Sequence, residues 1–124
     1  MTDISKTDWK IFKELRELAL DRFCSRVLDE IARIGSDQAK SRHDRYLAIC
    51  RFIQERDREI NPIVDYLRRS SAVRQLCAFR ARDLVTEEEL KSLSPELRKR
   101  VEDIVRIFNQ PLEVVDENDD ADPR

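Results

Sequence analysis

The sequence of 124 residues contains a single glycine, Gly35. Glycine supplies the positive-φ positions that tight β-hairpin turns need, so this chain has few ways to build an antiparallel sheet or barrel. Charged residues make up 40% of the chain, against roughly a quarter in ordinary globular domains, and hydrophobic residues another 40%. We therefore expect an all-α fold, a compact helical bundle with a long first helix, an antiparallel second helix and several short helices.

The longest helical pattern begins at Thr7 or Asp8, either of which can cap a helix. It ends at Gly35, which we expect to turn into the left-handed conformation. A helix of about 27 residues would be roughly 40 Å long. Its apolar positions recur every three or four residues, at Phe12, Leu15, Ala19, Phe23, Val27, Ile31 and Ile34.

A second helix is predicted from Ser41, its cap, to about Ile60, with Asp44 assisting at the first turn. Asp57 interrupts the apolar stripe, and we expect it at the edge of the core, paired with an arginine, because burial without a partner is costly. The face expected to be buried consists of Tyr46, Leu47, Cys50, Ile53 and Ile60.

Asparagine caps helices well and proline is favoured in a first turn, so Asn61–Pro62 predicts the start of a third helix over residues 62–69. A fourth helix is expected to start at Ser70 or Ser71 and to end near Arg82. These two short helices follow the long pair directly, and we expect them to pack across it.

Residues 85–90 combine two signals for the start of a short helix. Thr86 and Glu89 have the spacing of a capping box, and Val85 can pack on Leu90 as a hydrophobic staple. Ser94–Pro95 then begins the last helix. Its apolar stripe, which ends before Pro111, consists of Leu97, Val101, Ile104, Val105 and Phe108.

Charge divides the chain into two parts, a helical domain over residues 1–110 and an acidic segment over residues 111–124. The acidic segment holds six acids and one base, so it carries −5 and the domain +3. Residues after Leu112 bury too little apolar surface to offset their ordering entropy, and we expect them to be disordered.

The chain lacks the roughly 20 consecutive apolar residues that cross a bilayer, and its start lacks the basic-then-apolar pattern of a signal peptide. We therefore expect a cytoplasmic protein with no membrane contact. Cys24, Cys50 and Cys77 are an odd number at wide spacing, each among apolar residues. We expect small buried side chains there and no structural disulfide.

Catalytic and metal-binding patterns are weak. The one histidine, His43, shares a helix face with Cys50 two turns away, and a metal site would need Cys24 or Cys77 to converge on them. A chain with one glycine cannot contain the glycine-rich phosphate-binding loops. The interpretation is a protein that is not an enzyme and has no cofactor and no metal, with a small enzyme or metal protein at His43 as the third alternative.

One segment, residues 67–82, is rich in arginine and contains no acid. Uninterrupted positive charge can attract phosphate, so a nucleic-acid-associated protein is the second hypothesis. Acidic groups of neighbouring helices could also neutralise these side chains. The candidate anion or nucleic-acid contacts are Arg68, Arg69, Arg74, Arg80 and Arg82.

Four runs of sequence resemble a group of short, uncharacterised helical proteins of bacteria, over roughly residues 7 to 105. The runs are DWKIFKELRELAL, RFIQERDREI, LRRSSAVRQL and VTEEELKSLSPELRKRVE. The resemblance implies a bacterial, cytosolic origin. It carries over no activity, ligand or catalytic residue.

The first hypothesis for function is a non-enzymatic helical module for protein interaction or regulation that acts through helix faces. The first helix is longer than the second by about nine residues, or roughly 13 Å, and something must cover the excess. We expect a homodimer through the first helix, since two-fold pairing is the commonest arrangement of soluble oligomers. The candidate dimer face consists of Trp9, Phe12 and Leu20.

Overall fold

The computed structural model describes residues 4–109, and within that range the chain forms helices and connections without a strand. The predicted all-α class is confirmed. The acidic segment lies outside the described residues, and so does its expected disorder. The elements are α1 (Lys6–Gly35), α2 (Arg42–Val64), a 3₁₀ turn (Arg69–Ser71), α3 (Ala72–Ala81), α4 (Glu87–Leu90) and α5 (Pro95–Asn109).

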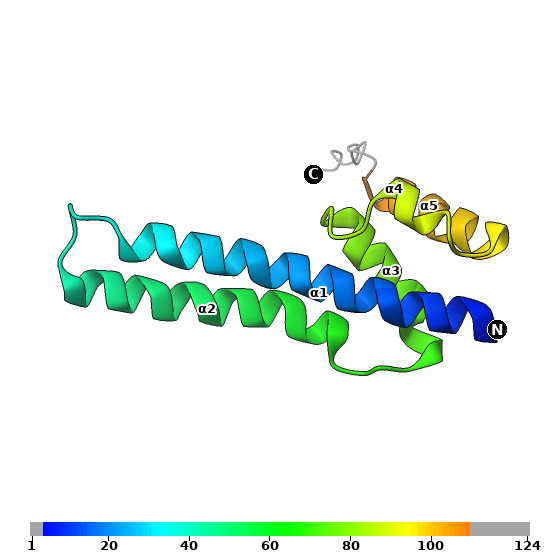
Figure 1. Ribbon diagram of the computed structural model, residues 1–124, viewed down its shortest axis with the longest axis horizontal. Helices are drawn as coiled ribbons and strands as arrows, with labels where there is room; N and C mark the ends of the chain where they lie inside the picture. Colours follow the sequence, from blue (N-terminus) through cyan, green and yellow to red (C-terminus); the bar gives the residue numbers. More distant parts are fainter. Residues whose placement is uncertain (1–3, 110–124) are drawn as a thin grey trace, which may run out of the picture.

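α1 and α2 run antiparallel as a long hairpin, and α3, α4 and α5 gather around the N-terminal half of α1 (Figure 1). We call these three helices, together with the first half of α1, the base. The distal half of the hairpin projects from the base, and there α1 and α2 lie beside each other with no other helix of residues 4–109 next to them (Figure 1). The long first helix, the antiparallel second helix and the short helices are confirmed.

The core of the molecule lies in the base. Hydrophobic side chains with no exposed surface come from α1, α3, α4, α5 and the connection before α4: Phe12, Ala19, Ala72, Leu76, Phe79, Val85, Leu90 and Val101. The distal part of the α1 stripe, including Phe23 and Val27, is only partly buried. A single neighbouring helix cannot enclose an apolar stripe on all sides. The distal hairpin therefore buries only the line of contact between α1 and α2, whereas the base encloses a core.

The predicted ends of α1 need two corrections. Ser5 caps the helix, not Thr7 or Asp8, and its Oγ accepts a hydrogen bond from the Asp8 N–H at 3.0 Å. Asp8 is buried and its carboxylate instead accepts bonds from the Ser94 N–H at 2.8 Å and the Ser94 hydroxyl at 2.6 Å. This link ties the start of α1 to the start of α5.

Gly35 is the last residue of α1 and has no positive φ, so the expected left-handed turn there is wrong. The helix ends with its C-cap residue Ser36, which has φ −97°, and the Ser36 N–H donates to the carbonyl oxygens of Ala32 and Arg33. Such a closure needs no left-handed residue. Within residues 4–109, the left-handed region is occupied by a non-glycine residue, Asp83, at φ 57°.

α2 continues through Asn61 and Pro62 to Val64, so the predicted end at Ile60 and the predicted helix over 62–69 are wrong. Ile60 and Ile63, three residues apart, are both buried, with 6% and 7% of their surfaces exposed. Helical spacing places both side chains on one face, and their burial stabilises the helix beyond the proline. Residues after Val64 then leave the helix until the 3₁₀ turn.

Ser71 precedes α3 but does not cap it with its side chain. Its hydroxyl donates to the Arg68 carbonyl at 2.9 Å and accepts from the Gln75 amide at 3.1 Å. Gln75 is fully buried and also donates to the Tyr66 carbonyl at 2.8 Å. These bonds give hydrogen-bond partners to carbonyl groups of the irregular segment between α2 and α3. Local capping rules do not predict such bonds.

The predicted starts of α4 and α5 are confirmed, but Phe108, the last residue of the predicted α5 stripe, is 80% exposed. Thr86 and Glu89 form the full capping box, and Val85 and Leu90 are both completely buried. α5 begins at Pro95, and the hydroxyl of Ser94 accepts a bond from the Leu97 N–H at 3.3 Å.

Candidate interaction surfaces

The distal half of α2 exposes apolar side chains that the sequence predicts to be buried. Tyr46 is 63% exposed, Ile53 39% and Leu47 37%. The stripe is present as predicted, but the base does not extend far enough to cover it (Figure 1). The predicted buried face of the second helix is therefore wrong for these residues.

Leu20, Cys24 and Leu28 lie four residues apart on α1, so they share one side of that helix. Tyr46 and Ile53, seven residues apart, share one side of α2. We call these five residues the hairpin face. Leu28 is 64% exposed, and Cys24, expected to be buried, is exposed.

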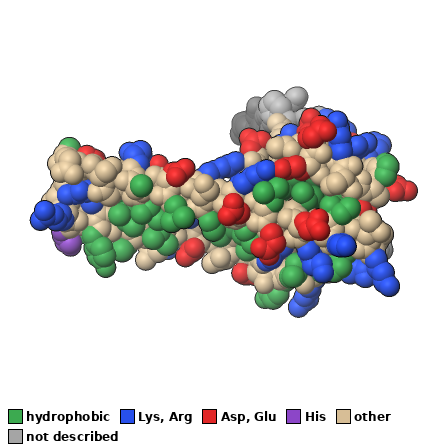
Figure 2. All heavy atoms as spheres, viewed as in Figure 1, with side chains coloured by type: hydrophobic (Ala, Val, Ile, Leu, Met, Phe, Trp, Pro, Cys, Tyr) green, Lys and Arg blue, Asp and Glu red, His purple; other side chains and the backbone are tan. Residues whose placement is uncertain are grey.

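The hairpin face borders a shallow groove between α1 and α2 of about 380 Å³. Hydrophobic side chains form a band along the hairpin in the left half of Figure 2. The groove is lined by Leu20, Phe23, Cys24, Val27, Leu28, Ile53, Arg56, Asp57, Ile60, Asn61 and Val64. It is an apolar strip with a few polar groups on its α2 side.

Two of those polar groups, Arg56 and Asp57, are neighbours on α2. Arg56 lies over the ring of Phe52, 5.3 Å from its centroid, and pairs with Glu59 at 3.5 Å. Asp57 is exposed, and the ion pairs within residues 4–109 do not include it, so its predicted pairing with an arginine is wrong for the described chain. At an exposed position the carboxylate keeps its hydration and needs no partner.

The predicted dimer face does not form one surface. Phe12 is completely buried in the core of its own chain. Trp9 is partly buried and stacks on Phe12, with ring centroids 5.5 Å apart. Leu20, partly buried, alone of the three belongs to the hairpin face, because the base covers the first turns of α1.

Three arginines of this segment lie in the connection before α3 or in its first turns, and each contacts a group of its own chain: Arg68, Arg69 and Arg74. Arg69 donates to the Ile4 carbonyl at 2.8 Å, and Arg74 donates to the Pro62 carbonyl at 3.2 Å. Arg68 is exposed and lies over the Tyr66 ring, 5.0 Å from its centroid.

The two arginines at the end of α3 form ion pairs. Arg80 pairs with Asp83 at 3.2 Å and with Glu87 at 3.8 Å. Arg82 pairs with Glu59 of α2 at 3.2 Å. Arg80 and Arg82, like Arg69 and Arg74, therefore bind backbone carbonyl or carboxylate groups within the fold. The arginine-rich segment does not present one uncompensated positive face.

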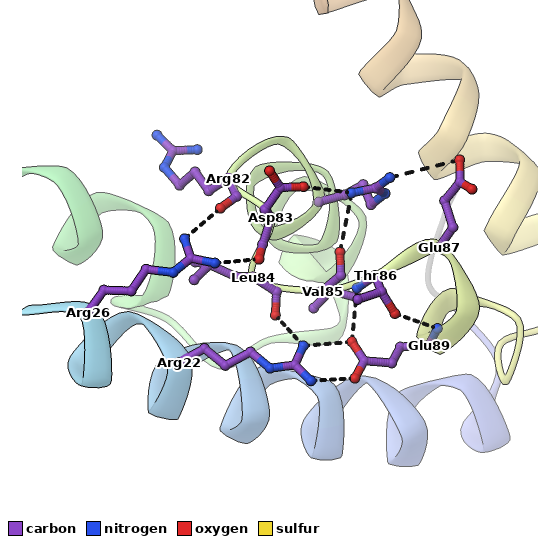
Figure 3. Close-up of polar contacts among 10 residues, drawn as sticks. Arg22, Arg26, Arg82, Asp83, Leu84, Val85, Thr86, Glu87 and Glu89 are labelled. Atoms are coloured by element: carbon purple, nitrogen blue, oxygen red, sulfur yellow. Dashed lines mark hydrogen bonds and ion pairs between the residues drawn. The ribbon is translucent and has the colours of Figure 1, made fainter.

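A second arginine cluster, on α1, holds the connection between α3 and α4 (Figure 3). Arg22 donates to both carboxylate oxygens of Glu89, at 2.7 and 2.6 Å, and to the Leu84 carbonyl at 3.0 Å. Arg26 donates to the carbonyls of Arg82 at 2.9 Å and Asp83 at 2.6 Å. We call these contacts the α1 clamp.

The α1 clamp changes the titration of Glu89. The hydrogen bonds from Arg22 lower the pKa of the Glu89 carboxyl to about 2, and the bond from the Thr86 backbone contributes. The same pairing raises the pKa of the Arg22 guanidinium. Sequence reasoning explains Glu89 by its capping box alone and misses Arg22 and Arg26, whose spacing of four residues on one α1 side is the available signal.

A larger groove, of about 550 Å³, lies between α3 and α5. Burial raises the pKa of the Cys77 thiol on its floor. We call it the α3/α5 groove, and it is lined by Ser70, Val73, Arg74, Cys77, Ala78, Ala81, Arg82, Ile104, Val105 and Phe108.

His43 is exposed near the start of α2, at the far end of the hairpin. Cys24, Cys50 and Cys77 are free thiols. Within residues 4–109, no three His, Cys, Asp or Glu side chains come together as a metal site. The structure therefore does not bring His43 and the cysteines into the constellation that the metal hypothesis requires.

Comparison with protein-family models, curated proteins and solved structures finds no match. None of the helices in residues 4–109 combines the length and the apolar character needed to span a bilayer.

Proposed function

We propose that the protein is a non-enzymatic helical interaction module that binds a second copy of itself through the hairpin face. The observation that carries this proposal is the exposure of Leu28 at 64%, Tyr46 at 63% and Ile53 at 39% on adjacent helices. Contiguous exposed apolar surface is a liability in water and is typical of interaction sites.

The form of the hairpin supports a second copy as the partner. A pair of antiparallel helices buries one seam and leaves an apolar face that two further helices can cover, as in a four-helix bundle. Two-fold pairing places the same patch of each copy against itself. If the axis passes near the middle of the groove, it also brings Arg56 of one copy toward the exposed Asp57 of the other.

The nucleic-acid alternative lacks comparable support. Its candidate residues Arg69, Arg74, Arg80 and Arg82 already bind carbonyl or carboxylate groups of the same chain. A phosphate would compete with these partners for the same guanidinium groups, and the partners already compensate part of the positive charge.

Leu28→Glu tests the homodimer. At micromolar concentration, light scattering of the unmodified protein is expected to give twice the chain mass of 14.7 kDa, and Leu28→Glu is expected to give the mass of one chain. The reason is that a two-fold interface buries the introduced carboxylate twice without a partner.

Ile107→Glu is the matched control, because Ile107 on α5 is 63% exposed, close to the 64% of Leu28. This variant should keep the mass of the unmodified protein, and circular dichroism should show both variants to be folded. A mass of one chain for the unmodified protein, or a folded Leu28→Glu variant with the mass of two chains, overturns the proposal.

A further inference from the structure

The α3/α5 groove has a floor of small or partly buried α3 side chains, among them Val73, Cys77 and Ala78. Phe108 of α5 lines the groove while 80% of its surface is exposed. Among the described residues that line it, the charged ones are Arg74 and Arg82, and none is acidic. An occupant that fits has a short apolar stretch next to negative charge.

The sequence directly after α5 has that chemistry. α5 ends at Asn109, one residue beyond Phe108, and the apolar residues Leu112, Val114 and Val115 follow within a few positions. An extended chain spans about 3.3 Å per residue, so Leu112 can lie roughly 13 Å from Phe108. Acids then follow at Asp116, Glu117, Asp119, Asp120 and Asp122.

Attachment and charge favour this segment over a separate molecule. A site and a ligand joined by a short flexible linker meet at an effective concentration in the millimolar range. The acidic segment contains six acids and one base. Arg74 and Arg82 line the groove and carry guanidinium N–H groups beyond those that bind Pro62, Ala78 and Glu59. Attraction between exposed charges over this range is screened by salt, with a screening length of about 10 Å at 0.1 M.

We infer that residues 112–115 of the chain bind in the α3/α5 groove and that the acids after them lie beside Arg74 and Arg82. The segment then covers Cys77 and Phe108, and any partner for the groove must displace it. This surface is separate from the hairpin face, so the inference stands independently of the homodimer.

The labelling rate of Cys77 reports on the inferred contact. In full-length protein with Cys24→Ser and Cys50→Ser, a thiol-reactive dye labels Cys77 through the groove. Adding Leu112→Ser, Val114→Ser and Val115→Ser is expected to raise this rate several-fold, because the apolar contacts that cover the thiol are lost. In the matched reporter with Cys50→Ser and Cys77→Ser, the same three substitutions should leave Cys24 labelling unchanged.

Salt gives a second readout in the same reporter. Raising salt from about 0.1 M to about 1 M, where the screening length falls to about 3 Å, should speed Cys77 labelling with the native segment and not with the serine-substituted one. Equal Cys77 rates with and without the three serine substitutions overturn the inference. An equal rise at Cys77 and Cys24 also overturns it, since that result indicates general loosening of the fold.

Discussion

At the scale of a residue, Glu89 combines a local and a distant role. Its carboxylate accepts the Thr86 N–H at 2.9 Å within the capping box and both guanidinium bonds from Arg22. The pKa of Glu89 is lowered from 4.5 to about 2. A lowered pKa in the folded state stabilises the fold above the unfolded value, and this stabilisation is lost as the pH falls from 4.5 toward 2.

Glu89→Gln should separate the two roles, because glutamine keeps the capping acceptor but has no charge. We expect the free energy of unfolding at neutral pH to fall by about 1 kcal/mol, a value reduced by the partial exposure of the pair. The variant should also lose less stability than the unmodified protein between pH 4.5 and 2. Urea unfolding at several pH values measures both effects.

Glu88→Gln is the control for Glu89→Gln. Its partner is Lys91, and both side chains are exposed, so the change in stability is expected to stay below about 0.5 kcal/mol. A Glu89→Gln protein whose stability depends on acid pH as steeply as that of the unmodified protein would contradict the assigned role of Arg22.

At the scale of an element, the end of α1 shows that glycine is not required where the chain has it. Gly35 lies in the helix with no positive φ, and an added Cβ would lie 3.7 Å from the Ile49 Cδ1 atom, an ordinary contact. Gly35→Ala is therefore expected to raise the free energy of unfolding by about 0.5–1 kcal/mol, mainly by restricting the unfolded chain. Chemical denaturation of the two proteins measures the difference.

Asp83→Ala provides a control of opposite sign, because the backbone at Asp83 has φ 57°. Alanine in the left-handed region costs about 1–2 kcal/mol. A loss of stability in Gly35→Ala, or none in Asp83→Ala, would mean that the backbone at these two positions differs from the described conformation.

The elements also show what the sequence could predict and why. The capping box at Thr86 and Glu89 was predictable because it depends on residues three apart. The helix through Pro62 was not, because it depends on the burial of Ile60 and Ile63 against distant helices. Periodicity identifies an apolar face of α2 but not its cover, so Tyr46 and Ile53 were expected in the core.

The candidate surfaces were also predictable where they depend on local sequence and unpredictable where they depend on distant contacts. The apolar stripe of α1 from Phe12 to Ile34 was visible in the sequence, and so was the arginine-rich segment. The partners of those arginines were not, since the link from Arg22 to Glu89 spans 67 residues. The α3/α5 groove depends on how two helices pack, and no local pattern encodes that packing.

At the scale of the whole molecule, stability is expected to be uneven. Side chains with no exposed surface, such as Phe12, Leu76 and Phe79, belong to the base. The distal hairpin has one seam and an exposed apolar face. Regions with few buried apolar contacts open locally at a lower free energy than the core.

Hydrogen exchange should reveal this difference. In a Leu28→Glu protein, amides of residues 28–34 and 44–52 are expected to exchange several-fold faster than in the unmodified protein, because a second hairpin no longer covers them. Amides of α3 should exchange at the rate of global unfolding in both proteins. Equal protection of the distal hairpin in the two proteins would contradict its burial against a second copy.

The bond between Asp8 and Ser94 joins residues 86 positions apart, and it bears on the order in which the chain can fold during synthesis. α2 follows α1 after a short connection, so the distal hairpin can close while the ribosome is still making α3. The first half of α1 has to wait for the helices of the base, and until they emerge Phe12, Leu15 and Ala19 have no core to enter. The first half of α1 is thus synthesised before the base helices but buried only after they emerge, and transiently exposed apolar surface of this kind is prone to aggregation.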